Sequence, residues 1–225
     1  MTRFYLPASG SAPVSPAYAT ASWTNSASAA RLPLVSAKTG TALSNMTLPE
    51  VASSAHQLAR QFVGPTMDAQ IISGTVQGQI KVREGNAAVN AFSQAVIRVC
   101  DSAGTTFRGT LVSLDTTGGT EWVSTTSLTG RNFPRDGVVA ITSLSCQAND
   151  RIVVEVGAHI GVGGEAATSL NFGDVVSASD LTSDQADTGT DNPWMEFSAT
   201  IVFAGAGGGS TVPVMYMHYM KQFQG

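Results

Sequence analysis

Hydrophobic and polar residues alternate along the chain from about residue 56 onward, and residues 69–83 show this most clearly. The apolar residues and glycines of this stretch share one parity: Ile72, Gly74, Val76, Gly78, Ile80 and Val82. A period of two residues predicts a β-strand that buries one face and exposes the other. The stretch is long for a single strand, and its glycines indicate a bend or a bulge.

Further strands are predicted at 57–63, 92–100, 105–114, 121–127, 138–145, 151–157 and 194–203. The DSAG sequence between two of these strands favours a hairpin, and Gly, Asn or Asp precedes most of the others. No amphipathic helix longer than about two turns is evident. Roughly eight to ten short strands predict an all-β fold, a sandwich or a barrel. A jelly-roll-like β-sandwich is our first choice and an immunoglobulin-like sandwich our second.

Residues 1–50 are rich in proline, which restricts the backbone and removes donors: Pro7, Pro13, Pro16, Pro33 and Pro49. The same segment carries large apolar side chains that a disordered tail normally lacks: Phe4, Tyr5, Leu6, Tyr18 and Trp23. Two interpretations remain open. The segment is either an extended arm laid along a surface, or a set of irregular strands of the same domain.

Residues 204–211 (AGAGGGST) have the composition of a flexible linker, which follows a body at 51–204. Beyond the linker, VPVMYMHYMKQFQG is apolar or aromatic on both faces of an expected strand, and such a strand should be covered on both faces. Residues 205–225 are therefore either a C-terminal assembly segment that pairs with a partner chain or the last strand of the same sandwich. The candidate interface residues at the two chain ends are Phe4, Tyr5, Leu6, Met215, Tyr216, Met217 and Tyr219.

Charged residues make up 12% of the chain, about half of the roughly 25% usual in soluble domains. A surface poor in charge suits contact with other proteins, because the centres of interfaces are depleted in charge. The net charge is −4, and no Lys or Arg occurs between Arg151 and Lys221. We therefore expect no nucleic-acid partner. The N-terminus lacks the apolar stretch of a signal peptide, and no window has the length of a membrane span.

The residues that carry chemistry form no recognisable constellation. Cys100 and Cys146 are far apart and read as buried free thiols rather than zinc ligands. The three histidines have no metal-ligand spacing, and Glu155 and Glu196 read as ordinary strand residues. We expect no enzyme and no catalytic, cofactor or metal site.

The segment 173–193 is acidic and contains no basic residue: Asp174, Asp180, Asp184, Asp187 and Asp191. Carboxylates that are grouped with Ser, Thr and Asn suit calcium, which takes six to eight oxygen ligands. The spacing matches no known calcium loop, and a solvated acidic loop is the more ordinary interpretation.

Four stretches resemble uncharacterised virion structural proteins of tailed phages and prophages: FYLPASGSAPVSPAY, RVCDSAGTTFRGTLVS, NDRIVVEVG and DNPWMEFSATIVF. The resemblance implies a virion component made in the host cytoplasm: a capsid decoration or cement protein, a head–tail connector or a tail protein. Its partners would be other virion proteins and copies of itself in a homo-oligomer. The alternative is a carbohydrate- or receptor-binding sandwich that uses Trp122 and Trp194 as aromatic platforms.

Overall fold

The computed structural model describes residues 1–25, 29–114, 119–122, 127–163, 168–182 and 190–205. In these ranges the regular secondary structure is β-strand, apart from one short 3-10 helix, η1 (Ala87–Val89). No helix in the described ranges is long and apolar enough to span a bilayer. The prediction of an all-β fold is confirmed.

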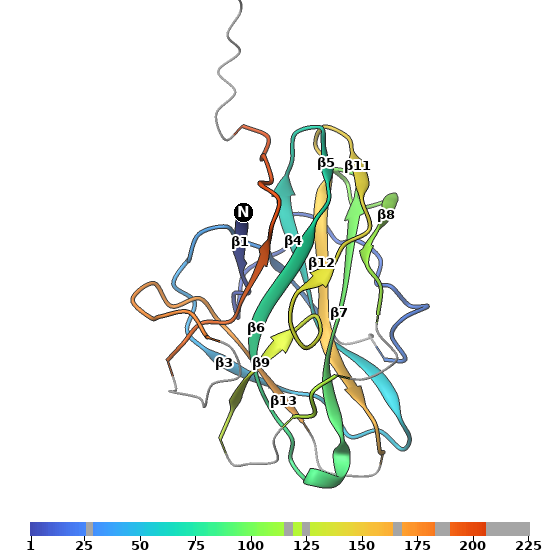
Figure 1. Ribbon diagram of the computed structural model, residues 1–225, viewed down its shortest axis with the longest axis vertical. Helices are drawn as coiled ribbons and strands as arrows, with labels where there is room; N and C mark the ends of the chain where they lie inside the picture. The colour runs from blue at the N-terminus through green and yellow to red at the C-terminus, as the bar shows by residue number, and fades with distance from the viewer. Residues whose placement is uncertain (26–28, 115–118, 123–126, 164–167, 183–189, 206–225) are drawn as a thin grey trace, which may run out of the picture.

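Two main sheets make up the molecule (Figure 1). The first contains, in spatial order, β1 (Thr2–Tyr5), β14 (Trp194–Phe197), β6 (Thr75–Arg83), β13 (Ser169–Phe172) and β3 (Ser44–Thr47), with β9 (Thr129–Phe133) and β10 (Val139–Ala140) also paired to β6. The second contains β2 (Ala30–Pro33), β4 (Ala55–Thr66), β12 (Arg151–Ile160), β7 (Ala91–Cys100) and β8 (Phe107–Val112). A small two-stranded antiparallel sheet pairs β5 (Gln70–Ile72) with β11 (Leu144–Cys146).

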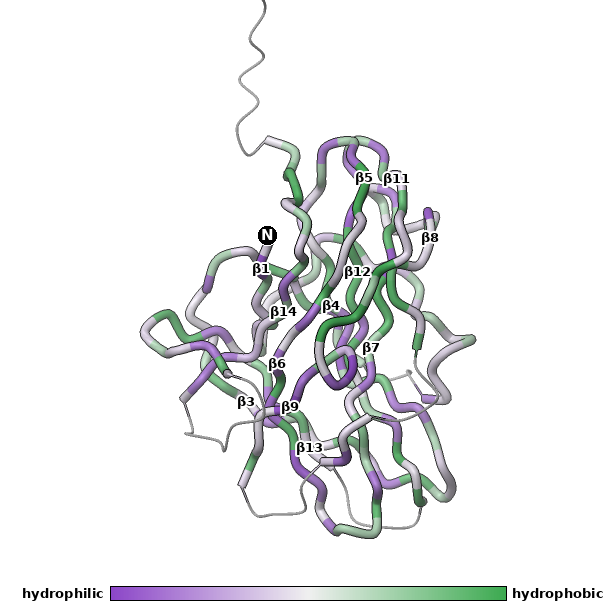
Figure 2. Tube along the Cα trace, in the orientation of Figure 1, coloured by the Kyte–Doolittle hydropathy of each residue, from purple (hydrophilic) through white to green (hydrophobic). Residues whose placement is uncertain are grey.

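The two main sheets pack face to face as a β-sandwich, as predicted. Phe62 of β4 and Phe172 of β13 meet in the core with ring centroids 5.5 Å apart, and both are at most 1% exposed. Apolar residues concentrate along the strands that face this core, while many loops are polar (Figure 2). Burial of this apolar area drives the packing of the sheets, at about 25 cal/mol per Å².

The long predicted strand 69–83 divides at Gly74, whose φ of +96° is accessible mainly to glycine. Residues on either side of the break join different sheets, because β5 pairs with β11 and β6 lies in the seven-stranded sheet. The predicted inward parity is confirmed, since Ile72, Val76 and Ile80 are 0% exposed. The glycines thus mark a change of sheet within one alternating stretch.

Residues 1–50 belong to the sandwich and are not an arm laid on a neighbour. They supply β1 and β3 to one sheet and β2 to the other. Phe4 and Leu6 are 0% exposed, and Phe4 packs edge-to-face on Phe197 with centroids 6.0 Å apart. The prediction of an intermolecular interface at Phe4 and Leu6 is therefore wrong. The pairing of β1 with β14 turns Phe4 into the core of its own chain, and Leu6, just beyond β1, is held by its bridge to Gly173.

The cysteine prediction is confirmed, because Cys100 and Cys146 are free and buried. Burial raises the pKa of both thiols to about 11. Neither thiol has the thiolate character that reactive cysteines need.

Candidate functional site

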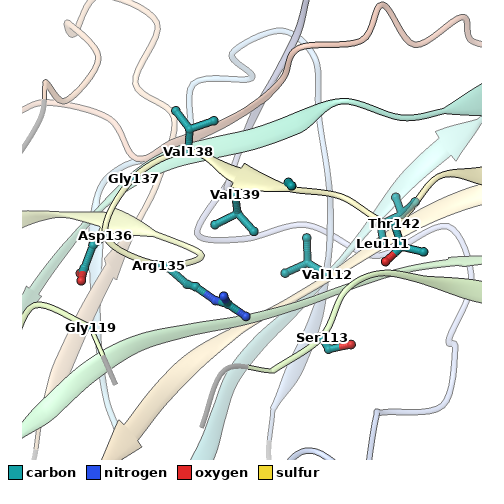
Figure 3. Close-up of a pocket in the computed structure, with 11 residues that line it drawn as sticks. Leu111, Val112, Ser113, Gly119, Arg135, Asp136, Gly137, Val138, Val139 and Thr142 are labelled. Atoms are coloured by element: carbon teal, nitrogen blue, oxygen red, sulfur yellow. The ribbon is translucent and has the colours of Figure 1, made fainter. Parts of the chain in front are cut away.

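A groove of about 930 Å³ lies at the seam between the two main sheets. One wall is the end of β8 with Ser113, and the other is the loop Arg135–Thr142, which includes β10. Figure 3 shows Val112 and Val139 facing one another across this space, and the side chain of Arg135 extending between the two walls. Val138 points away from it and is 62% exposed.

Hydrogen bonds connect the walls at each end of the groove. At one end the backbone N–H of Thr142 donates to the carbonyl of Leu111 at 2.9 Å. At the other, the backbone N–H of Thr120 donates to the Asp136 carboxylate. Between these points, no backbone hydrogen bond joins Val112 or Ser113 to the opposite wall within the described residues. The result is a slot of mixed lining, in which Val112 and Val139 face one another among hydroxyl, guanidinium, carboxylate and backbone groups.

The outer face of the five-stranded sheet is covered by residues 16–25, which we call the strap. Its anchor is the Glu155 carboxylate at the centre of β12, which is 0% exposed. Trp23 Nε1 donates to this carboxylate at 2.6 Å, and the backbone N–H of Ala19 donates at 3.1 Å. Arg98 and Gln61 complete the cluster at 2.5 and 2.9 Å. The carboxylate is therefore fully engaged in fastening the strap to the sheet.

The acidic segment 173–193 also turns its described carboxylates toward this chain's own donors. Asp174 is 0% exposed and accepts from the backbone N–H and hydroxyl of both Thr39 and Thr41, at 2.5–2.7 Å. Asp180 pairs with Arg3 and Lys38, each at 2.8 Å. No group of three or more metal-ligating side chains occurs in the described part of the chain, and Asp184 and Asp187 lie outside it. These contacts support no calcium site at Asp174 or Asp180.

Two histidines that appeared unrelated in the sequence meet across neighbouring strands. His56 of β4 and His159 of β12 are register partners, and their rings stack with centroids 4.5 Å apart. Burial lowers the pKa of both imidazoles, and the neighbouring His159 lowers the pKa of His56 further. Ser54 Oγ lies 3.1 Å from His159 Nε2.

A serine beside a neutral imidazole is half of a nucleophile–base arrangement, which needs a third group to orient the imidazole. His159 Nδ1 is buried and has no hydrogen-bond partner among the described residues. The described lining of the groove includes neither Ser54 nor a histidine. The pair therefore lacks both the orienting group and the groove that this chemistry requires.

The tryptophans proposed as sugar platforms are buried. Trp122 is 2% exposed and donates from Nε1 to Ser93 Oγ, and Trp194 is 8% exposed and donates from Nε1 to the carbonyl of Leu181. The prediction that they form an exposed binding platform is wrong, because both indoles fill the interior of the fold.

The remaining interface residues divide between the body and the undescribed end. Tyr5 is half-buried, and its hydroxyl donates to Asp180 at 3.2 Å, so it also serves the chain's own fold. Met215, Tyr216, Met217 and Tyr219 lie outside the described residues. The groove was not anticipated from the sequence, because its walls are distant along the chain and carry no motif.

Comparisons with known proteins give few relatives. No family model and no curated protein matches the chain. Two crystal structures of a CocE/NonD family hydrolase from Staphylococcus aureus are similar to it. The first covers 89% of this chain at 9% identity with a TM-score of 0.49, and the second covers 90% at 10% identity with a TM-score of 0.45. This chain spans about a third of each hydrolase, 36% in both cases.

These neighbours correct one prediction. Because both similar structures are hydrolases, the expectation that this chain is not an enzyme is withdrawn. With TM-scores below 0.5, the likeness assigns no active-site residue and no substrate to this chain.

Proposed function

We propose that the chain is a structural component of a tailed-phage particle and acts by assembling with copies of itself and with other virion proteins. The resemblance of four sequence stretches to virion proteins supports this function, and so does a charged fraction of only 12%. The protein would then reside in the particle, as a capsid decoration protein, a head–tail connector or a tail protein.

One observation carries the proposal. The described sandwich is complete without the C-terminal sequence, because its last strand ends at Phe197 and both main sheets are built from earlier residues. Beyond Gly205 the sequence still contains VPVMYMHYMK, which is apolar on both faces of an expected strand. A strand of this kind needs protein on both sides, and a neighbouring subunit provides it.

The energetics suit a repeated assembly. A strand that buries a few hundred Å² of apolar area gains several kcal/mol, at about 25 cal/mol per Å², before the cost of ordering it. Symmetry in a closed oligomer repeats this gain at every interface. A body whose N-terminal strand and strap are fastened internally would keep the geometry of those interfaces constant.

Sedimentation equilibrium of the full chain and of a chain ending at residue 205 tests the proposal. We expect the full chain to be an oligomer and the shortened chain to be a monomer. A matched control replaces residues 206–209 with Ser and should retain the oligomer, because it changes only the linker. A full chain that stays monomeric at all concentrations contradicts the assembly function. Mass spectrometry of purified phage particles tests the virion location, which the absence of this chain's peptides would contradict.

A further inference from the structure

We infer that the groove between β8 and the loop Arg135–Thr142 receives residues 212–221 of a second copy of this chain. The inference rests on the proposed function and names the surface where assembly takes place. The groove lies between β8 of one main sheet and β10, which pairs with β6 of the other, and Val112 and Val139 face one another across it.

The walls of the groove are chemically suited to a strand. Between the hydrogen bond at Leu111 and the contact at Asp136, the backbones of Val112 and of Gly137–Ala140 line an open slot. An added strand gains affinity from main-chain hydrogen bonds and specificity from pockets for alternate side chains. Val112 and Val139 supply the apolar contact for one face of such a strand (Figure 3).

The proposed occupant matches the groove in size and character. A volume of about 930 Å³ accommodates several large side chains, and the segment offers methionines and tyrosines at successive positions. Methionine adapts to irregular apolar space.

The path of the chain favours a second copy over the same copy. The described chain ends at Gly205, next to the hydrogen bond from the Ala204 N–H to the Thr66 carbonyl at the end of β4. In the five-stranded sheet, β12 and β7 separate β4 from β8, so the groove lies about 14 Å across the sheet from that point. The inner face of the sheet between these points is core and the strap covers its outer face, so a direct path is blocked, and the linker 206–211 spans only about 20 Å when fully extended. A neighbouring molecule has no such restriction.

Cysteine cross-linking distinguishes these arrangements. Ser113, an exposed residue of the groove, is changed in one full-length chain (Ser113→Cys), and Met217 in another (Met217→Cys). We expect a covalent heterodimer on oxidation of the mixture, and at least about tenfold less of it when a peptide of residues 212–221 is added in excess. Cys100 and Cys146 are buried with raised pKa values, so they contribute little background. A third chain carries both substitutions. If it cross-links within itself while the mixture of single variants gives no heterodimer, the inference is overturned.

Two valines, one that lines the groove and one that is exposed elsewhere, provide a second, independent measurement. Val139→Asp places a carboxylate in the groove and should weaken self-association at least about tenfold, while Val176→Asp, at a valine that is 66% exposed and outside the described groove lining, should not. If Val139→Asp associates normally while the chain ending at residue 205 does not, the groove is wrong and the assembly function stands. If the full wild-type chain does not associate, both are wrong. Circular dichroism of each variant confirms that its fold is retained.

Discussion

The strap and the groove are two places where the five-stranded sheet meets other polypeptide, and they differ in how they are filled. The strap covers the outer face with the chain's own residues and is fastened by a buried charge, Glu155. The groove beside β8 has two facing aliphatic side chains, Val112 and Val139, among polar groups, and its two walls are joined by the hydrogen bond from Thr142 to Leu111. The surface under the strap is closed by directional polar contacts, whereas the groove offers the apolar area of Val112 and Val139.

The difference indicates how this fold separates internal cohesion from assembly. Charge-assisted hydrogen bonds in a buried site are costly to break and fix one arrangement. Apolar contact at an open edge is less specific in geometry and is gained only when a partner is present. Under the proposed function, a subunit with such internal contacts would fold alone and would then associate through the groove.

The largest expected effect comes from breaking the strap anchor. Glu155→Ala leaves the Arg98 guanidinium, 11% exposed, without its 2.5 Å partner and removes the acceptor of Trp23 Nε1. Loss of one partner from a buried pair costs about 3–5 kcal/mol. We expect urea unfolding to show a loss of this size.

The control for the strap anchor is Glu196→Gln. Glu196 pairs with Arg3 at 3.1 Å in a more exposed setting, and its loss should cost less than about 1 kcal/mol. Equal losses in the two variants would contradict the role assigned to Glu155.

A second internal clamp should have an intermediate effect. Asp174→Asn turns one acceptor oxygen into a donor that faces the N–H and hydroxyl groups of Thr39 and Thr41. Leaving these buried groups mismatched should lower the free energy of unfolding by about 2 kcal/mol. Urea unfolding measures this loss. A thermal melt of the wild type with millimolar calcium should give an unchanged melting temperature, because these oxygens already have donors. A calcium-dependent rise would restore the metal hypothesis for segment 173–193.

The smallest expected effect is a loss of folding stability in acid, caused by the stacked histidines His56 and His159. The pKa of the His56 and His159 imidazoles is lowered in the folded state, so the unfolded chain binds more protons below its own histidine pKa of about 6.5. Their contribution is fully present above that pH and is lost as the pH falls below it. The end of the strap contacts this histidine pair, because the backbone N–H of Thr24 donates to the His56 carbonyl at 2.8 Å.

Unfolding measured at pH 7.5 and pH 5.0 checks this dependence. The double variant His56→Gln and His159→Gln should lose less stability between the two pH values than the wild type. Identical pH profiles would show that the stacked pair does not contribute. Self-association through the groove should not follow this titration, because the described groove lining contains no histidine.

Local pattern predicted the long strands β4, β7, β8 and β12, but it also predicted a strand at 121–127 that the described residues of this range do not form. The alternation through Ile72, Val76 and Ile80 gave the correct buried positions, and the isolated cysteines were read correctly as buried thiols. The same pattern failed at Gly74, because a glycine signals a bend without showing that the strand then joins another sheet. Short strands such as β9 and β13 carry too few residues for a period to be recognised.

The sites depend on contacts that are distant in sequence, and no local signal reports them. Glu155 reads as an ordinary strand residue until Trp23, far toward the N-terminus, is placed beside it. The stacked histidines and the facing valines arise from strand register and sheet closure in the same way. Phe4 and Leu6 were assigned to an interface because proline-rich sequence hid the strand that buries them.

Hydrogen exchange of the full chain at low and high concentration tests the central claim most directly. The strap should be equally protected at both concentrations, because Glu155 holds it within each molecule. Amides of residues 111–113 and 137–142, together with those of 212–221, should gain protection only at the high concentration. Protection that rises with concentration elsewhere, and not along the groove, would contradict the account.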